Sequence, residues 1–200
     1  FMVSEDLKIG LLTDHVPLKN VSALITEKLI MEKARLMNES LIKDFRLQRP
    51  KIAVLGINPH CGDKGVIGTE DDDIVRPALK KLYFDENILV FGPFAADSFF
   101  GSQSYRNYDA VLAPYHDQGL IAFKTIAFGN GVNYTAGLSK VRTSPDHGTA
   151  YEIAGKDIAD PQSFRQAIYT ALDVFRNREE YAELTKNPLK IRTLELEKDK

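Results

Sequence analysis

The sequence predicts an α/β fold, because short apolar runs alternate along it with longer segments of helical periodicity. Alternation of this kind is typical of helices packed against a largely parallel sheet. No internal repeat and no low-complexity linker interrupts the pattern. With 200 residues, of which 44% are hydrophobic, the chain is long enough for one sizeable core, or for two lobes that share one.

Five apolar runs are the expected strands. The run at residues 51–57 is apolar through its middle, as a strand buried on both faces of a sheet requires. The run at 132–138 is expected to take a different orientation from the others. The remaining runs lie at residues 7–12, 88–91 and 110–113.

The clearest helix is predicted over residues 26–46. Thr26 suits its N-cap position, where a hydroxyl accepts a backbone N–H. A second amphipathic helix is predicted over 163–175, and the acidic residues at 70–73 are expected to open a third, where negative charge favours the helix dipole. The apolar residues of the first helix step by three or four positions and form one buried stripe, namely Ile30, Ala34, Met37, Leu41 and Phe45.

Composition excludes several classes of function. The net charge of −2 and the pI of about 6.1 argue against a general nucleic-acid binder. No apolar run approaches the roughly 20 residues that a membrane span needs. The single Cys61 rules out an intramolecular disulfide and favours a reducing compartment, so we expect a cytoplasmic protein. Phe1 precedes Met2, which we interpret as a sign of processing, cloning or a cut within a longer chain.

The four histidines lie at the ends of apolar runs. His15, His60 and His116 each follow an expected strand, and His147 lies in a later loop. Ligands of open α/β sheets bind beyond the carboxyl ends of the strands, so three of these imidazoles could converge. Three imidazoles make a catalytic metal site that prefers Zn, Co or Ni over Mg. The spacing alone equally describes loop histidines with ordinary hydrogen bonds.

Four separated motifs appear together in one order, and each contains one of the histidines. In this combination they closely resemble the 4-hydroxythreonine-4-phosphate dehydrogenase family of the pyridoxal-phosphate pathway. The likeness extends from about Leu7 to about Arg176. The motifs are Asp14-His15-Val16-Pro17-Leu18, Gly56-Ile57-Asn58-Pro59-His60-Cys61-Gly62, Tyr115-His116-Asp117-Gln118-Gly119 and Arg142-Thr143-Ser144-Pro145-Asp146-His147-Gly148-Thr149-Ala150.

The resemblance implies a three-layer α/β/α fold like that of isocitrate and isopropylmalate dehydrogenases, with the site in a cleft between two lobes. Residues 1–177 would then form one cleft-lining lobe and part of the other. Residues 178–200, in which Glu and Lys alternate with Leu, would form a charged helix or tail. Only fourteen residues precede His15, whereas the family has a substantial segment there that supplies a His-Thr pair. We therefore expect the fold to be incomplete at its N-terminus, and the chain alone to turn over far more slowly than a full-length relative.

The resemblance also implies a ligand set. One divalent ion (Zn, Co or Mg) would be held by His15, His60 and His116, with ligands shared across a homodimer. Asp117, beside His116, is a candidate to orient that metal ligand.

The family's substrate-contacting Lys, Asn and Arg correspond to Lys124, Asn133 and Arg142, and Lys124 is also a candidate proton donor or base. A point cation, a neutral donor and a planar fork are what a phosphate requires. The alternative is that Lys124 and Arg142 are surface charges. The glycines of residues 56–68 either pass close to a ligand or allow the turns around His60.

The stretch from His147 to Pro161 resembles the adenosine-binding loop of isopropylmalate dehydrogenases. His147 and Gly148 would lie near adenine, and Glu152 would hold the ribose hydroxyls of NAD. Asp160 stands where relatives often have Asn, which weakens its assignment to the adenine edge. The alternative for Glu152 is a solvated carboxylate.

The resemblance therefore implies an NAD- and metal-dependent enzyme. It would oxidise 4-phosphooxy-L-threonine to a 3-keto acid, which decarboxylates to 3-amino-2-oxopropyl phosphate. Two alternatives remain open. One is a dehydrogenase of a related phosphorylated acid, such as 4-phosphothreonate or 4-phosphoerythronate. The other is a non-catalytic fragment that binds metal or dimerises.

Overall fold

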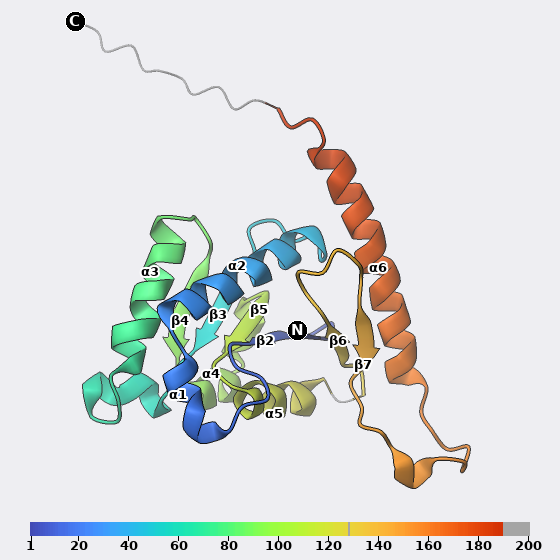
Figure 1. Cartoon of the computed structure of the whole chain (residues 1–200), viewed down its shortest axis with the longest axis horizontal. Helices are drawn as coiled ribbons and strands as arrows, with labels where there is room; N and C mark the ends of the chain where they lie inside the picture. Colours follow the sequence, from blue (N-terminus) through green and yellow to red (C-terminus); the bar gives the residue numbers. More distant parts are fainter. Residues whose placement is uncertain (128, 190–200) are drawn as a thin grey trace, which may run out of the picture.

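The computed structural model describes residues 1–127 and 129–189. They form one sheet in the order β4-β3-β5-β2-β1-β6-β7, with helices on both faces (Figure 1). The strands are β1 (Met2–Val3), β2 (Lys8–Leu11), β3 (Ile52–Leu55), β4 (Val90–Phe94), β5 (Ala110–Ala113), β6 (Val132–Tyr134) and β7 (Thr143–Pro145). The α-helices are α1 (Val21–Leu24), α2 (Glu27–Lys43), α3 (Arg76–Phe84), α4 (Ala96–Gly101), α5 (His116–Ile126) and α6 (Gln162–Thr185).

The sheet is mixed, which corrects the expectation of a largely parallel one. Strands β4, β3, β5 and β2 are parallel, whereas β1 pairs antiparallel with β2 and β6, and β6 pairs antiparallel with β7. Antiparallel neighbours need only a short connection, and short loops join β1 to β2 and β6 to β7. The expected change of orientation at 132–138 is confirmed for residues 132–134.

The central parallel strands β3 and β5 are buried on both faces, as their continuous apolar sequence predicts. In β3, Ile52 and Val54 pack with α2 and α3, whereas Ala53 and Leu55 pack with residues of α4 and α5. Side chains alternate across a strand, so one apolar run supplies both cores. The three-layer α/β/α arrangement predicted from the sequence is confirmed (Figure 1).

The helices largely follow their predicted stripes. The side chain of Thr26 accepts the backbone N–H of Leu29 at 3.2 Å and caps α2, whose apolar stripe is buried between Ile30 and Leu41. The acidic segment opens a π-helical turn, η3 (Asp71–Val75), that runs directly into α3. The helix α6 is longer than predicted and continues through residue 178, and the last residues of the expected tail, 190–200, lie outside the described part of the chain.

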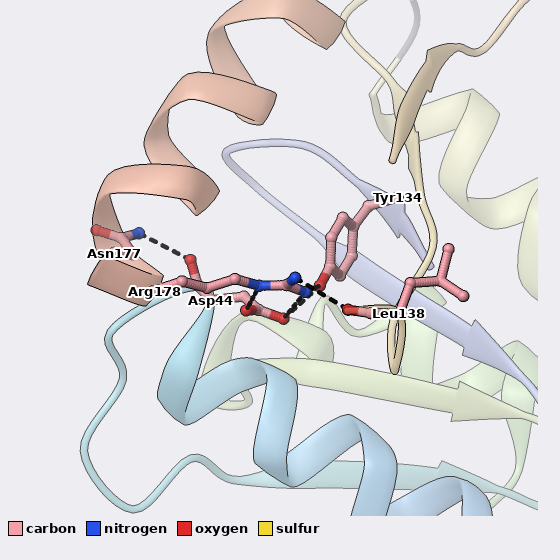
Figure 2. Close-up of polar contacts among 5 residues, drawn as sticks. All are labelled: Asp44, Tyr134, Leu138, Asn177 and Arg178. Carbon is pink, nitrogen blue, oxygen red and sulfur yellow. Dashed lines mark hydrogen bonds and ion pairs between the residues drawn. The ribbon is translucent and has the colours of Figure 1, made fainter. Parts of the chain in front are cut away.

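A buried polar cluster joins α6 to the end of α2 (Figure 2). The Arg178 guanidinium donates to the Asp44 carboxylate at 2.6 Å and to the Tyr134 hydroxyl at 3.0 Å, and that hydroxyl in turn donates to Asp44. The side chain of Asn177 donates to the Asp44 carbonyl at 2.7 Å. Burial and the neighbouring Asp44 raise the pKa of Tyr134 to about 12, so its hydroxyl stays a donor.

The face of α6 that points away from the sheet is also apolar. Side chains at spacings of three and four line it, each 46% to 58% exposed: Phe164, Ile168, Leu172 and Phe175, with Tyr169 alongside at 57%. A helix that is apolar on two faces is typical of an element buried in a larger assembly. Within residues 1–127 and 129–189, no helix combines the length and hydrophobicity needed to cross a bilayer.

We expect Arg178→Met to lower the free energy of unfolding by about 3 kcal/mol, because it leaves the buried Asp44 carboxylate without its cation. Urea denaturation followed by circular dichroism measures the effect. The control is Glu180→Gln, two residues further along α6. Its ion pair with Arg46 is solvent-exposed, so its loss should cost less than about 1 kcal/mol. Equal effects of the two substitutions would show that the cluster does not anchor α6.

Candidate active site

Two of the predicted metal ligands lie together because their loops follow neighbouring parallel strands. Leu11 at the end of β2 pairs with Ala113 at the end of β5, so the next residues of both strands leave the sheet side by side. The buried Thr13 joins the two loops through its hydroxyl, which donates to the Pro114 carbonyl at 2.8 Å. The rings of His15 and His116 consequently lie 5.6 Å apart, centroid to centroid.

His116 is the first residue of α5, and its ring is oriented by the next residue. Nδ1 of His116 lies 2.7 Å from a carboxylate oxygen of Asp117. Hydrogen bonding of one ring nitrogen to a carboxylate fixes the tautomer and leaves Nε2 as the ligand atom. The orienting role predicted for Asp117 is therefore compatible with this geometry.

The third predicted ligand, His60, lies in the turn η2 (Pro59–Gly65) after β3. Residues 60–64 all have positive φ, between 43° and 84°, and the turn folds toward α4. There, hydrogen bonds from Ser98 and, to a smaller extent, the nearby His60 lower the pKa of Asp97. Among the described residues no three His, Cys, Asp or Glu side chains are grouped to hold a metal. One chain thus brings two of the three histidines together, and the shared site stays a prediction.

The conformation of this turn depends on its glycines and on a buried carboxylate. A Cβ on Gly62, which has φ of 84°, would lie 2.2 Å from the Gly68 carbonyl oxygen. The fully buried Asp71 accepts the backbone N–H groups of Ile57 and Asn58 at 2.8 and 3.0 Å. Of the two explanations offered for the glycines, the structure favours the one in which they allow the turn around His60.

A cavity of about 480 Å³ connects the histidine pair to two of the predicted substrate contacts. His116, Leu120 and Lys124 occupy one face of α5 at spacings of four, and all three line it. Asn133 lines it from β6, where it is the exposed residue between two buried neighbours. A two-residue alternation along the strand therefore directs its amide into the cavity.

Arg142 is not among the residues that line this cavity, but it contacts one of them. Its guanidinium donates to the hydroxyl of Thr135 at 2.8 Å, and Thr135 lines the cavity. The backbone N–H of Thr135 donates to the Arg142 carbonyl at 3.0 Å across the β6–β7 hairpin. The structure therefore brings Lys124 and Asn133 to one cavity, and it connects Arg142 to that cavity only through Thr135.

The four predicted cofactor contacts lie apart from this cavity. His147, Gly148 and Glu152 are exposed on the loop after β7, which projects beyond the sheet in Figure 1, and Asp160 ends that loop. A carboxylate oxygen of Asp160 accepts the backbone N–H of Gln162 at the start of α6. All four are described, and none of them is among the residues that line the cavity.

The sequence did not single out three charged residues that line the cavity, namely Asp14, Lys33 and Asp146. Asp146 forms an ion pair with Lys124 at 3.1 Å. The sequence shows Asp146 beside His147, but it does not predict the ion pair with Lys124. That ion pair depends on how close α5 lies to the end of β7.

Comparison with known proteins identifies a family. The family model described as "Pyridoxal phosphate biosynthetic protein PdxA" matches residues 1–171. The 4-hydroxythreonine-4-phosphate dehydrogenase of Bacteroides thetaiotaomicron is 49% identical over 189 residues, 94% of this chain and 52% of that protein. The protein of the same name from Prosthecochloris aestuarii is 49% identical over 172 residues, 86% and 50% of the two chains.

Solved structures of similar fold include members of the same family. The crystal structure of 4-hydroxythreonine-4-phosphate dehydrogenase from Klebsiella pneumoniae matches with a TM-score of 0.75 and 35% identity, over 86% of this chain and 53% of that one. A terephthalate 1,2-cis-dihydrodiol dehydrogenase from Burkholderia xenovorans matches with a TM-score of 0.68 and 30% identity, over 86% and 54%. The chain spans about half the length of the relatives it matches.

We expect inorganic phosphate to bind at this cavity. Lys124→Met and Arg142→Met should each weaken that binding by about 1.5–3 kcal/mol, the scale of a charge-assisted hydrogen bond. Isothermal titration calorimetry measures the affinity. Lys140→Met is the matched control, because it removes an exposed cation that does not line the cavity. An equal loss in the control would indicate a general effect of net charge.

Proposed function

The chain belongs to the family of the pyridoxal phosphate biosynthetic protein PdxA, and we propose that it carries the metal- and substrate-binding part of a 4-hydroxythreonine-4-phosphate dehydrogenase. The observation that carries this proposal is that His15, His116, Lys124 and Asn133 all line the same cavity. The proposed reaction oxidises the C3 alcohol of 4-phosphooxy-L-threonine with NAD. The resulting 3-keto acid loses CO₂ and yields 3-amino-2-oxopropyl phosphate.

The histidine pair fits a divalent ion in part. His15 and His116 offer two imidazole donors on adjacent loops, and Asp117 engages the other nitrogen of His116. A third donor is needed for a catalytic site of three histidines. We propose that His60 of a second copy supplies it, in a homodimer with shared sites. Imidazole donors favour Zn or Co over Mg.

The substrate is proposed to lie with its phosphate toward Lys124, Asn133 and Arg142 and its alcohol toward the histidines. The cavity volume of about 480 Å³ suits a small phosphorylated acid. When bound, a divalent ion would polarise the alcohol oxygen as a Lewis acid, and NAD would accept the hydride. We propose that Lys124, which lines the cavity, holds the anionic substrate as an ammonium and serves as the proton donor, or as the base in its neutral amine form.

We expect NADH to form when the protein is mixed with 4-phosphooxy-L-threonine, NAD and Zn²⁺ or Co²⁺, and a chelator to stop its formation. His116→Ala should weaken Co²⁺ binding at least tenfold, about 1.4 kcal/mol, because it removes one of the imidazole donors. NADH absorbance and calorimetry measure the two effects.

The control is Asp173→Asn, a charge change on α6 outside the site. Binding of metal and phosphate without NADH would show a binding module in place of an enzyme. If NADH forms with 4-phosphothreonate or 4-phosphoerythronate but not with 4-phosphooxy-L-threonine, the substrate assignment changes to that acid. Unchanged Co²⁺ binding in His116→Ala would remove the histidine pair from the proposal.

The choice of cofactor is expected to depend on Glu152. A carboxylate near the adenosine ribose accepts a hydrogen bond from NAD and repels the additional phosphate of NADP. The protein should therefore bind NAD about tenfold more tightly than NADP, a difference of roughly 1.4 kcal/mol. Glu152→Lys should narrow this gap in a fluorescence titration, whereas the same charge reversal at the distant Glu179 should not. An unchanged gap in Glu152→Lys would identify Glu152 as a surface carboxylate.

A further inference from the structure

A partly buried carboxylate, that of Asp146, shares the cavity with Lys124, the cation proposed to bind the substrate. Asp146 follows β7, and one of its oxygens lies 3.1 Å from Nζ of Lys124, which projects from the last turn of α5. Only 16% of the Asp146 side chain is exposed, compared with 53% of the Lys124 side chain. The pair therefore joins a partly buried anion to an exposed cation.

Two parts of the fold, the start of α6 and the segment just before β6, fix the position of Asp146. Its backbone N–H donates to the hydroxyl of Ser163 at 3.0 Å, in the first turn of α6, and that hydroxyl donates to the Gly131 carbonyl at 3.3 Å. The carboxylate packs directly against Gly131. A Cβ at residue 131 would lie 2.8 Å from Oδ2 of Asp146 and 2.8 Å from the ring of Phe123. The absence of a side chain at Gly131 is what gives the carboxylate its place.

A lysine without such a partner samples many rotamers, because its charge sits on a flexible four-carbon stem. An exposed ion pair contributes little to stability, since water screens it. Its effect here is on geometry: the carboxylate holds the ammonium on the wall shared by His116 and Asn133. A negative charge in a cavity for a phosphorylated anion also opposes ligand binding. A role in positioning the Lys124 ammonium explains why the Asp146 carboxylate lies in this cavity, although its charge repels an anionic substrate.

We propose that Asp146 is a positioning residue, which holds the ammonium of Lys124 in the cavity toward the anionic substrate. This inference rests on the proposed function. It makes two predictions that a purely structural carboxylate does not make: loss of the charge frees Lys124, and it separates substrate binding from turnover.

The first experiment measures Lys124 directly and needs no enzymatic activity. The protein is treated with an acetylating reagent, and the rate at Lys124 is followed by mass spectrometry of its peptide. Asp146→Asn should raise this rate about two- to fivefold, the range that an exposed ion pair supports. Asp146→Glu, which keeps the charge, should restore most of the protection. Asp173→Asn should leave the rate unchanged. The same rate in the wild type and Asp146→Asn would overturn the proposal.

The second experiment compares binding and turnover. In Asp146→Asn, inorganic phosphate should bind as tightly as in the wild type or more tightly, whereas kcat with 4-phosphooxy-L-threonine and NAD should fall about two- to fivefold, the same range as the change in acetylation rate. In a Lys124→Met background the same substitution should leave kcat unaltered, because the residue it positions is gone. Parallel loss of affinity and kcat in both backgrounds would indicate a structural role.

The two proposals fail in distinguishable ways. If no variant forms NADH but Asp146→Asn still changes the acetylation rate of Lys124, the positioning role of Asp146 is supported and the proposed dehydrogenase activity is rejected. If Asp146→Asn does not fold, Asp146→Glu provides the test. Because this variant keeps the charge, its acetylation rate at Lys124 and its kcat should both stay close to those of the wild type. A freed Lys124 in Asp146→Glu would overturn the inference.

Discussion

The parallel pairing of β2 with β5 is the contact on which the fold and the candidate site both depend. β2 lies between the parallel strands of the sheet and its antiparallel strands, so it joins the two parts into one sheet. The register that pairs Leu11 with Ala113 also sets which residues leave the sheet together. A shift by one residue would exchange the two faces of the strand and separate the loops that carry His15 and His116.

Much of the fold could be predicted because its determinants are local. The stripe and cap of α2 and the apolar runs of β3 and β5 specify elements that need no knowledge of their partners. The mixed sheet could not be predicted in the same way. β1 has only two residues, and its pairing is decided by the strands beside it. The extension of α6 beyond residue 175 was missed because anchoring contacts at Asn177 and Arg178 hold it, in place of an apolar stripe.

The candidate site was predictable where its residues follow strands, and not where they meet by packing. His15, His60 and His116 were all expected to converge because ligands bind beyond the carboxyl ends of the strands. Within one chain only His15 and His116 do so, since β2 and β5 are neighbours. The direction taken by His60 depends on a run of left-handed residues, which sequence patterns do not specify. Asp146 lies in a motif from which only the role of the neighbouring His147 was predicted. Only the space left by Gly131 places its carboxylate against Lys124.

The outward apolar face of α6 has a consequence for the behaviour of the chain in solution. Phe164, Ile168, Leu172 and Phe175 present aromatic and aliphatic groups to water along three turns of one helix. A net charge of −2 on 200 residues provides little long-range repulsion between molecules. This surface therefore favours association between copies of the chain. Salts such as sulfate, which strengthen apolar association, will lower the solubility limit, and a protein surface that covers α6 will raise it.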